Sequence, residues 1–274
     1  MERELSKLRV AVIGAGKIGT ILLQGMLQHG LFRKENVHAT VQHGERACTL
    51  EKELGVRVTT DNVEAVRESD VVLVCVKPQM VGQVMEQIAP VATNSKLFIS
   101  VAASVPTDYM EKRVPQDCHI IRAMPNTPSM VGVGMTALSK GKFATQEDVE
   151  LALALFNTIG RTVLVDEKHM DAITGLSASG PAFIYIVLES LAEGGVKVGL
   201  PRDMATLLAA QMTLGAAKMV LETGHHPALL KDAVTTPAGC TIDGILELEE
   251  GKIRVTLIKA VVKAALRAKE LVFS

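Results

Sequence analysis

The sequence predicts an α/β protein, with a doubly wound parallel sheet in its N-terminal part and an all-helical C-terminal part. Between residues 8 and 123, short apolar runs rich in β-branched residues alternate with helical periodicity. Buried parallel strands and their crossover helices give this pattern. After residue 165 the pattern changes to long helices that are apolar over much of their circumference. We therefore expect two domains, residues 1–166 and residues 167–274.

The composition argues against several classes of protein. A chain of 274 residues, 48% of them hydrophobic, can bury the cores of two ordinary domains. Lys and Arg (29) nearly balance Asp and Glu (30), and Trp is absent, so we expect no nucleic-acid partner. The four cysteines form no Cys-x-x-Cys pair, and His and Cys do not cluster, so we expect reduced thiols and no metal site. No apolar run approaches the roughly 20 residues that cross a bilayer, so we expect a soluble, cytoplasmic protein without a membrane partner.

The first predicted strand, residues 8–13, leads directly into a glycine-rich turn, Gly14-Ala15-Gly16-Lys17-Ile18-Gly19, and then into a helix. In this setting Gly14 allows a tight turn, Gly16 lets a pyrophosphate approach the backbone, and Gly19 lets the helix pack on the strand. The helix N-terminus then faces the phosphates. The motif therefore predicts a Rossmann-type dinucleotide site, with a ligand-free glycine turn as the alternative.

The end of the second strand, residues 36–41, indicates which dinucleotide is preferred. A site for NAD often has Asp or Glu there to hold the ribose 2′-hydroxyl. The strand end here reads Thr40-Val41-Gln42-His43, with no acidic residue between it and Glu45, which leaves room for a 2′-phosphate. We expect NADPH, with NADH as an alternative. The candidate phosphate partners are Thr40, Gln42, His43 and Arg46.

Three further strands end in residues suited to ligand binding. The strand at 71–76 ends in Lys77-Pro78, and the strand at 97–101 ends in Ala102-Ala103-Ser104, small enough for a nicotinamide ring to lie close. The strand at 119–123 leads to a Pro125-Asn126-Thr127-Pro128 loop. There Asn126 either contacts a ligand or closes an Asx turn. Carboxyl ends of parallel strands meet at one sheet edge, which is where ligands bind.

The C-terminal part predicts helices that pack closely. Ser179 and Pro181 predict a helix start as N-cap and first helical residue, and Gly224 predicts the end of a helix from residue 202. The last helix is expected at 253–272. Gly194-Gly195 and alanine-rich faces indicate more burial than one copy of this part provides, so we expect a homo-oligomer.

Between two of these helices lies a turn of small and hydroxyl residues, Thr235 to Thr241. Pro237 stops one helix, Gly239 allows close backbone approach, and the next helix is expected to start at about Thr241. Free N–H groups at such a start can bind a carboxylate or phosphate. An ordinary helix–helix connection is the alternative.

This turn resembles the signature of the pyrroline-5-carboxylate reductase family. The family has a Pro-x-Gly-x-Thr core, here Pro237, Gly239 and Thr241, followed at fixed spacing by small, aliphatic and acidic residues. The resemblance covers nearly the whole chain. Further matching segments are Gly14-Ala15-Gly16, Val76-Lys77-Pro78, Pro125-Asn126-Thr127-Pro128, Gly180-Pro181 and Gly199-Leu200-Pro201.

The resemblance implies an N-terminal Rossmann domain and a C-terminal all-helical dimerisation domain, with dimers that often form decamers. It implies the NAD(P)H-dependent reduction of a cyclic imine, 1-pyrroline-5-carboxylate, to L-proline. For this reaction we expect a catalytic role for Thr241, whose hydroxyl donates to the imine nitrogen or orients a water. The implied substrate contacts are Glu167, Ala238, Gly239, Cys240 and Thr241. The implied cofactor contacts are Gly14, Ala15, Gly16, Lys17, Ile18, Thr40, Gln42, Asn62, Cys75, Val76, Lys77, Pro78, Ala102, Ala103 and Ser104.

The chain departs from the family pattern at a few positions. Ser104, Ala178 and Ala238 stand where glycine is common, and Cys240 stands where Ala or Thr is common. These departures bear on how tightly the substrate is held. Two alternatives stay open: a reductase of another cyclic imine, such as 1-pyrroline-2-carboxylate, or a nucleotide-sensing protein without turnover. A β-hydroxyacid dehydrogenase has a similar plan, but it needs a lysine that residues 180–196 lack.

Overall fold

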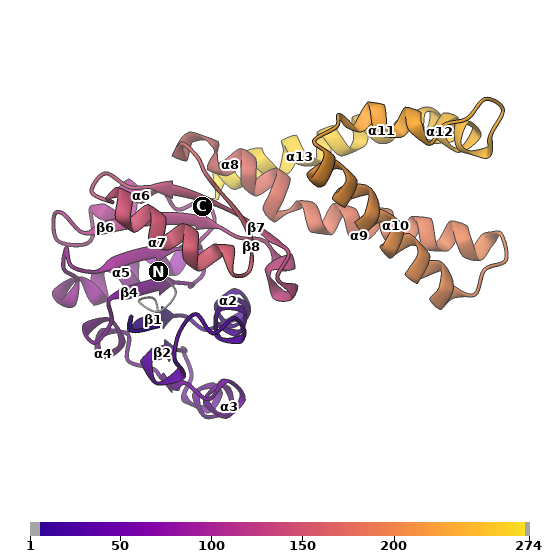
Figure 1. The fold of residues 1–274 in the computed structure, drawn as a ribbon. Helices are drawn as coiled ribbons and strands as arrows, with labels where there is room; N and C mark the ends of the chain where they lie inside the picture. The colour runs from indigo at the N-terminus through magenta and orange to yellow at the C-terminus, as the bar shows by residue number, and fades with distance from the viewer. Residues whose placement is uncertain (1–5, 272–274) are drawn as a thin grey trace. The chain divides into compact units, whose positions relative to one another are not determined.

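The computed structural model describes residues 6–271, which form two compact units (Figure 1). One unit contains the chain up to Ser179 together with the residues from Ala264 onward, and the other is Gly180–Lys263. We describe each unit by itself.

The first unit is built on a sheet whose order, within the described residues, is β3-β2-β1-β4-β5-β6-β7-β8. Neighbouring strands are parallel except β6 and β7, which are antiparallel. The strand order reverses between β1 and β4, which is the topological switch point of a doubly wound fold. The strands are β1 Val10–Ile13, β2 Val37–Thr40, β3 Arg57–Thr59, β4 Val71–Val74, β5 Leu97–Ser100, β6 His119–Met124, β7 Gly134–Lys140 and β8 Gly160–Leu164.

Helices cover both faces of this sheet, as the alternation along β1 requires (Figure 1). Val10 and Val12 pack in one hydrophobic cluster with α2, α3 and α7, whereas Ala11 and Ile13 pack in another with α4, α5 and α6. The predicted doubly wound sheet is therefore confirmed. The helices are α2 Lys17–Gln28, α3 Gly44–Leu54, α4 Asn62–Arg67, α5 Val81–Ile88, α6 Thr107–Glu111 and α7 Gln146–Asn157. Short 3-10 turns lie at Lys34–Asn36, Pro78–Met80, Ala89–Val91, Thr127–Val131 and Glu167–His169.

A long helical stretch follows β8, and it corrects one prediction. The 3-10 turn from Glu167, α8 (Met170–Ile173), a π-helical turn (Thr174–Ala178) and α9 (Gly180–Lys197) follow one another, so Ser179 does not cap a new helix. Its hydroxyl instead donates to the Thr174 carbonyl at 3.0 Å. Pro181 has no N–H to give to the helix, and a π turn is a common way to absorb such a break.

The second unit contains α10 Arg202–Thr223, α11 Pro227–Ala233 and α12 Cys240–Glu250, and α13 (Ile253–Glu270) begins in it. Gly195 allows close packing, because a Cβ there would lie 2.9 Å from the Ala205 Cβ. Gly224 ends α10 in the left-handed conformation, with φ of 67°, as predicted. The predicted end of the last helix, Val272, lies outside the described residues.

The helices of this part expose many large apolar side chains. The helix of residues 167–197 and the helix of residues 202–223 are both long and apolar enough to cross a membrane. The expectation that no segment approaches that length is therefore wrong. Charged residues scattered along the sequence interrupt the apolar runs, but the two helices still have a mean hydropathy of 1.3 and 1.4. The exposed large apolar side chains on α10 are Met204, Leu207, Leu208, Met212, Leu214, Met219 and Leu221.

Candidate active site

The glycine-rich turn has the geometry of a phosphate cradle. Gly14 has φ of +88°, and a Cβ there would lie 2.6 Å from Val76 Cγ1. A Cβ at Gly19 would lie 2.6 Å from the Gly14 carbonyl oxygen, so both positions require glycine for packing. At Gly16, the N-cap of α2, a Cβ would meet no described atom within 4 Å, and no described side chain caps the helix. The turn therefore leaves open space before free helix N–H groups, which fits a pyrophosphate.

Thr40 and Asn62 brace this turn. The Gly14 N–H donates to Thr40 Oγ1 at 3.2 Å, and the Thr40 hydroxyl donates to Asn62 Oδ1 at 2.7 Å. Asn62 Nδ2 donates in turn to Gln87 Oε1 at 2.9 Å. Thr40 is only 1% exposed, so its hydroxyl is engaged within the protein. A 2′-phosphate would find the exposed Gln42, His43 and Arg46 at the start of α3 more accessible.

The segments after β4 and β5 lie at the same edge of the sheet as the glycine turn. The Cys75 N–H donates to the Ile13 carbonyl at 2.8 Å, which joins the end of β4 to the end of β1. Burial raises the pKa of the Cys75 thiol to about 12, so this thiol is not a reactive group. Lys77 and Pro78 follow at the start of a 3-10 turn.

Ser104 is in an unusual environment. Its φ is +66°, its side chain is buried, and its hydroxyl has no hydrogen-bond partner within residues 6–271. The hydroxyl therefore points away from solvent, and a ligand at Ala102–Ser104 would meet backbone rather than this side chain.

The Glu167 carboxylate is bound by the protein itself. It accepts the Thr107 N–H at 2.8 Å and the Thr107 hydroxyl at 2.7 Å, and it pairs with Arg122 Nη1 at 3.4 Å. Arg122 is 3% exposed and also reaches Asp171 Oδ1 at 3.3 Å. Sequence patterns did not single out Thr107 or Arg122, although an arginine inside the apolar run of β6 was an available signal.

Asn126 is likewise engaged. Its Oδ1 accepts the Met135 N–H at 2.9 Å, and its Nδ2 donates to the Ser177 carbonyl at 3.2 Å. Pro181, four residues after Ser177, has no N–H to donate to that carbonyl. The Asn126 amide therefore has a structural role in this structure, and the Asx turn was not the correct alternative.

The turn before α12 is closed by the Gly239 N–H, which donates to the Thr236 carbonyl at 3.1 Å. Gly239 is the N-cap, so α12 begins at Cys240, one residue earlier than predicted. A Cβ at Gly239 would clash with the Thr236 hydroxyl. No side chain in the described chain caps this helix. Thr241, which is half-buried, therefore lies in a first helical turn with N–H groups available to a carboxylate.

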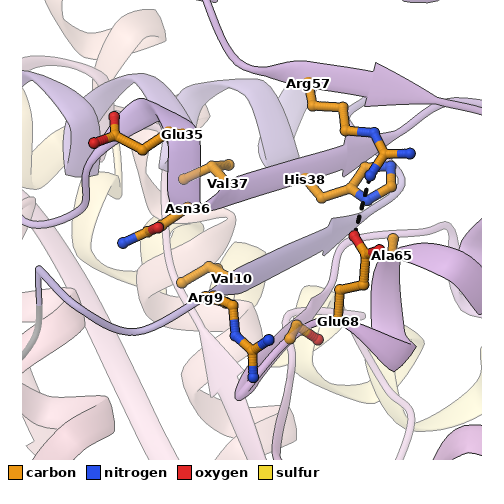
Figure 2. Close-up of a pocket in the computed structure, with 10 residues that line it drawn as sticks. Arg9, Val10, Glu35, Asn36, Val37, His38, Arg57, Ala65 and Glu68 are labelled. Carbon is orange, nitrogen blue, oxygen red and sulfur yellow. Dashed lines mark hydrogen bonds and ion pairs between the residues drawn. The ribbon is translucent and has the colours of Figure 1, made fainter.

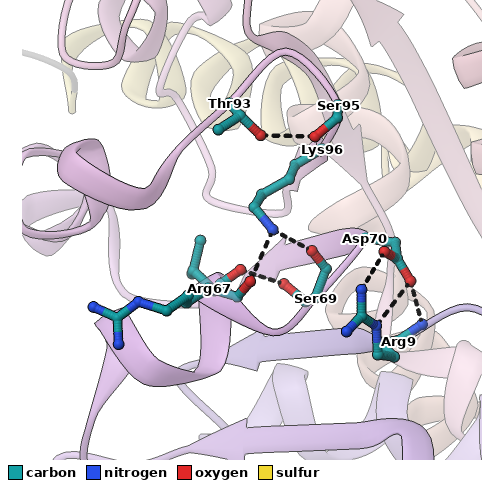
Figure 3. A network of polar contacts seen from close by, with 8 residues as sticks. Arg9, Arg67, Ser69, Asp70, Thr93, Ser95 and Lys96 are labelled. Atoms are coloured by element: carbon teal, nitrogen blue, oxygen red, sulfur yellow. Dashed lines mark hydrogen bonds and ion pairs between the residues drawn. The ribbon is translucent and has the colours of Figure 1, made fainter.

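A cavity lies at the opposite edge of the sheet, where β1 and β2 begin (Figure 2). Both of its arginines are paired. Arg57 pairs with Glu68, which also lines the cavity (Figure 2), and with Glu64, and Arg9 pairs with Asp70 (Figure 3). Lys96 lies nearby and donates to the Ser69 and Arg67 carbonyls at the end of α4 (Figure 3).

His38 lines this cavity and is buried. Its Nε2 is 2.8 Å from Thr59 Oγ1, while its Nδ1 has no partner among the described residues. Burial, and secondly the charge of Arg57, lower the pKa of His38. The ring is therefore more readily neutral than that of an exposed histidine.

Two family descriptions match the chain. Residues 9–104 match NADP oxidoreductase coenzyme F420-dependent, and residues 167–271 match pyrroline-5-carboxylate reductase dimerisation. The pyrroline-5-carboxylate reductase of Methanosarcina acetivorans is 46% identical over 263 residues, which cover 96% of this chain and 97% of that protein. The protein of the same name from Glycine max is 45% identical over 94% of both chains.

The chain belongs to the pyrroline-5-carboxylate reductase family. Solved structures of the family agree with this fold. A pyrroline carboxylate reductase from Plasmodium falciparum, with NADP bound, has a TM-score of 0.89 at 29% identity, covering 98% of this chain and 99% of that one. The pyrroline-5-carboxylate reductase from Coxiella burnetii has a TM-score of 0.88 at 34% identity, covering 97% and 99%.

Family membership explains the exposed apolar helices. The dimerisation region, residues 167–271, contains both helices that are long and apolar enough to cross a membrane. Association of two copies therefore accounts for this apolar surface, as expected for a helical unit that cannot bury it alone.

Two departures from the family pattern now have a physical description. Ser104 and Ala238 stand where glycine is common in the family, and they have φ of 66° and 57°. This left-handed region favours glycine, so the side chains at both positions carry backbone strain. Ala178, the third such position, lies in the π-helical turn instead.

Proposed function

We propose that this protein catalyses the NADPH-dependent reduction of 1-pyrroline-5-carboxylate to L-proline, the last step of proline biosynthesis. The observation that carries the proposal is 46% identity to the M. acetivorans pyrroline-5-carboxylate reductase along almost the whole of both chains. The open Gly16 turn and the uncapped start of α12 with Thr241 supply the chemistry that such a reaction needs. The absence of an acidic residue at the end of β2 supports NADPH over NADH.

When bound, the nicotinamide cofactor supplies a hydride to the imine carbon. The first turn of α2 and Gly16 would hold its pyrophosphate, and Ala102–Ser104 would contact its nicotinamide end. The N–H groups at Ala238–Thr241 bind the substrate carboxylate. The Thr241 hydroxyl contacts the imine nitrogen, either donating a proton or orienting a water. An imine that is already protonated needs no strong general acid, consistent with a threonine in this position.

The direct test follows the absorbance of NADPH, and of NADH in parallel, after addition of 1-pyrroline-5-carboxylate. We expect faster oxidation of NADPH. Thr241→Ala should lower kcat by roughly 100-fold, within the range for loss of proton transfer, and leave the NADPH dissociation constant unchanged. Equal losses in both would contradict the role of Thr241.

The same assay separates the alternatives. Oxidation that requires 1-pyrroline-2-carboxylate instead would indicate a reductase of that imine. NADPH binding without oxidation by either imine would favour a nucleotide sensor.

For the assembly and the location we propose what the family resemblance implies. The protein is a soluble homodimer, with residues 167–274 as the dimerisation domain and residues 1–166 as the dinucleotide-binding domain. We propose that these dimers associate further, up to a decamer, and that the protein acts in the cytoplasm without a nucleic-acid or membrane partner. Light scattering of the purified protein measures the number of subunits, and a mass of two chains would contradict the decamer.

A further inference from the structure

We propose that Thr107 and Glu167 form a clamp that positions Ala102–Ser104, so that Glu167 acts on the cofactor site through Thr107 rather than as a direct substrate ligand. The inference rests on the proposed function, because that function places the nicotinamide beside Ala102–Ser104.

Thr107 and Glu167 make a bidentate contact. The Thr107 N–H donates to Glu167 Oε1 at 2.8 Å, and its hydroxyl donates to Oε2 at 2.7 Å. Thr107 is the first residue of α6, whose N-cap, Pro106, has no capping side chain. Glu167, 60 residues away in the chain, supplies the negative charge that this helix start favours. Hydrogen bonds to a charged carboxylate are among the stronger ones in proteins.

The clamp holds the C-terminal end of the strained segment that contains Ser104. At the near end, the Val101 N–H donates to the Val74 carbonyl at 3.0 Å, which continues the ladder of β5 onto β4. Ser104 has φ of +66° and an unpartnered hydroxyl within the described chain, and such a conformation persists only where its surroundings hold it. Between Ser104 and Thr107 there are only two residues, Val105 and Pro106. The position of Thr107 therefore limits where Ala102–Ser104 can lie.

Arg122 holds the other side of the clamp. It is 3% exposed and lies 3.4 Å from Glu167 Oε1 and 3.3 Å from Asp171 Oδ1. Its single positive charge lies between the two carboxylates, whose side chains are 29% and 34% exposed. With three contacts to its two oxygens, the Glu167 carboxylate is oriented toward the protein, which assigns it a positioning role.

The test measures NADPH affinity by fluorescence titration of the full-length protein, and also kcat, the KM for the imine and the melting temperature. Thr107→Val removes the hydroxyl while keeping the shape, and it should weaken NADPH binding roughly 3- to 10-fold, as expected for one hydrogen bond to a charged group. The KM for the imine should stay within twofold. Thr107→Ser should restore the affinity, because it restores the hydroxyl.

Thr158→Val is the matched control. The Thr158 hydroxyl is also part-buried in the first unit and donates to the Leu155 carbonyl at 2.7 Å, at the end of α7. This variant should also lose one hydroxyl hydrogen bond, here to a neutral carbonyl, and with it some stability, without a change in NADPH affinity. Equal loss of affinity in Thr107→Val and Thr158→Val would overturn the proposal.

Glu167→Gln decides between the two roles of the carboxylate. We expect weaker NADPH binding, as in Thr107→Val. A rise in the KM for the imine alone, with NADPH affinity unchanged in both variants, would make Glu167 a substrate ligand and overturn the clamp. A wild-type protein that binds NADPH but reduces neither imine would contradict the proposed function alone, because the affinity series still tests the clamp. A wild type that binds neither NADPH nor NADH would overturn both.

Discussion

The two units of this chain bury their apolar side chains to very different extents. In the first unit every residue of β1, β4 and β5 is buried, and helices on both faces close two hydrophobic clusters. In the second unit the buried cluster consists of Ala192, Ala205 and Ala209, while leucines and methionines of α10 are exposed. One unit therefore completes its own core, whereas the other contributes part of a core that a second copy of the chain completes.

A charge placed on the exposed face of α10 should have the largest effect, because it opposes the association of two copies through that face. Leu207, 68% exposed in the single chain, becomes glutamate in Leu207→Glu. Burial of an unpaired charge costs several kcal/mol, so we expect the dimer dissociation constant to rise by roughly 100-fold or more. Analytical ultracentrifugation measures it. Gln83→Glu, on an exposed position of α5, is the control, and dimers as stable as wild type in Leu207→Glu would exclude this face from the interface.

Removing the buried arginine of the first unit should give the next largest effect. Arg122→Met leaves the partly exposed carboxylates of Glu167 and Asp171 without their cation and should lower the free energy of unfolding by about 1.5–3 kcal/mol. Urea denaturation measures the loss. Arg254→Met breaks only the exposed pair with Glu249, 2.6 Å apart, and should cost at most about 1 kcal/mol. Similar losses of unfolding free energy in the two variants would show that the buried position of Arg122 does not increase its contribution to stability.

Two glycines of the glycine-rich turn are expected to have different roles, Gly19 in packing and Gly16 in cofactor binding. In Gly19→Ala the added Cβ meets the Gly14 carbonyl, so stability should fall by about 1–3 kcal/mol. In Gly16→Ala the Cβ enters open space, so the melting temperature should stay unchanged. The methyl group should nevertheless weaken NADPH binding roughly tenfold, since it occupies the space of the pyrophosphate. Unchanged NADPH affinity in Gly16→Ala would place the cofactor elsewhere.

Relief of backbone strain should have a smaller effect and should raise, rather than lower, the free energy of unfolding. One such position lies in each unit. Ser104→Gly and Ala238→Gly each place glycine at a positive φ and should raise the free energy of unfolding by about 1 kcal/mol. Ala103→Gly, at a position without positive φ, should instead lower it by about 0.5–1 kcal/mol. Thermal unfolding of the three variants distinguishes these signs. A loss of stability in Ser104→Gly would show that its buried hydroxyl stabilises the segment.

The smallest effect should come from His38. Its pKa lies below the ordinary value of 6.5 in the folded protein, so the unfolded chain binds a proton more readily. Stability should therefore fall as the pH drops below about 6.5 and level off below the folded pKa. His38→Gln should flatten this part of the stability curve. An equal slope in the variant would assign the pH dependence to other groups.

Most of the sheet could be predicted from the sequence because its central strands are continuous apolar runs. β3 escaped prediction because it has three residues and begins with the exposed Arg57, and β7 because it carries little apolar pattern. The Ser179 cap was wrong because a π turn continues the helix and Asn126, 51 residues away, takes up the Ser177 carbonyl. Local patterns hold no information on such a partner.

The same distinction applies to the candidate site. The glycine turn and the start of α12 are local motifs, so their residues could be named from spacing and resemblance. The partners of Glu167 lie 60 and 45 residues away, and the Thr40 hydroxyl faces Asn62 across 22 residues. Only the folded chain shows that these polar side chains contact protein groups.

The sparse core of the second unit also has a kinetic consequence. Since α9 and α10 meet through alanines and Gly195, a newly made chain gains little free energy by folding this unit alone. Its completion is then a second-order process, with a half-time that lengthens on dilution, while the first unit folds at a rate independent of concentration. During that interval the leucines of α10 are open to non-specific association, so the rate of synthesis should influence how much of the protein reaches its assembled form.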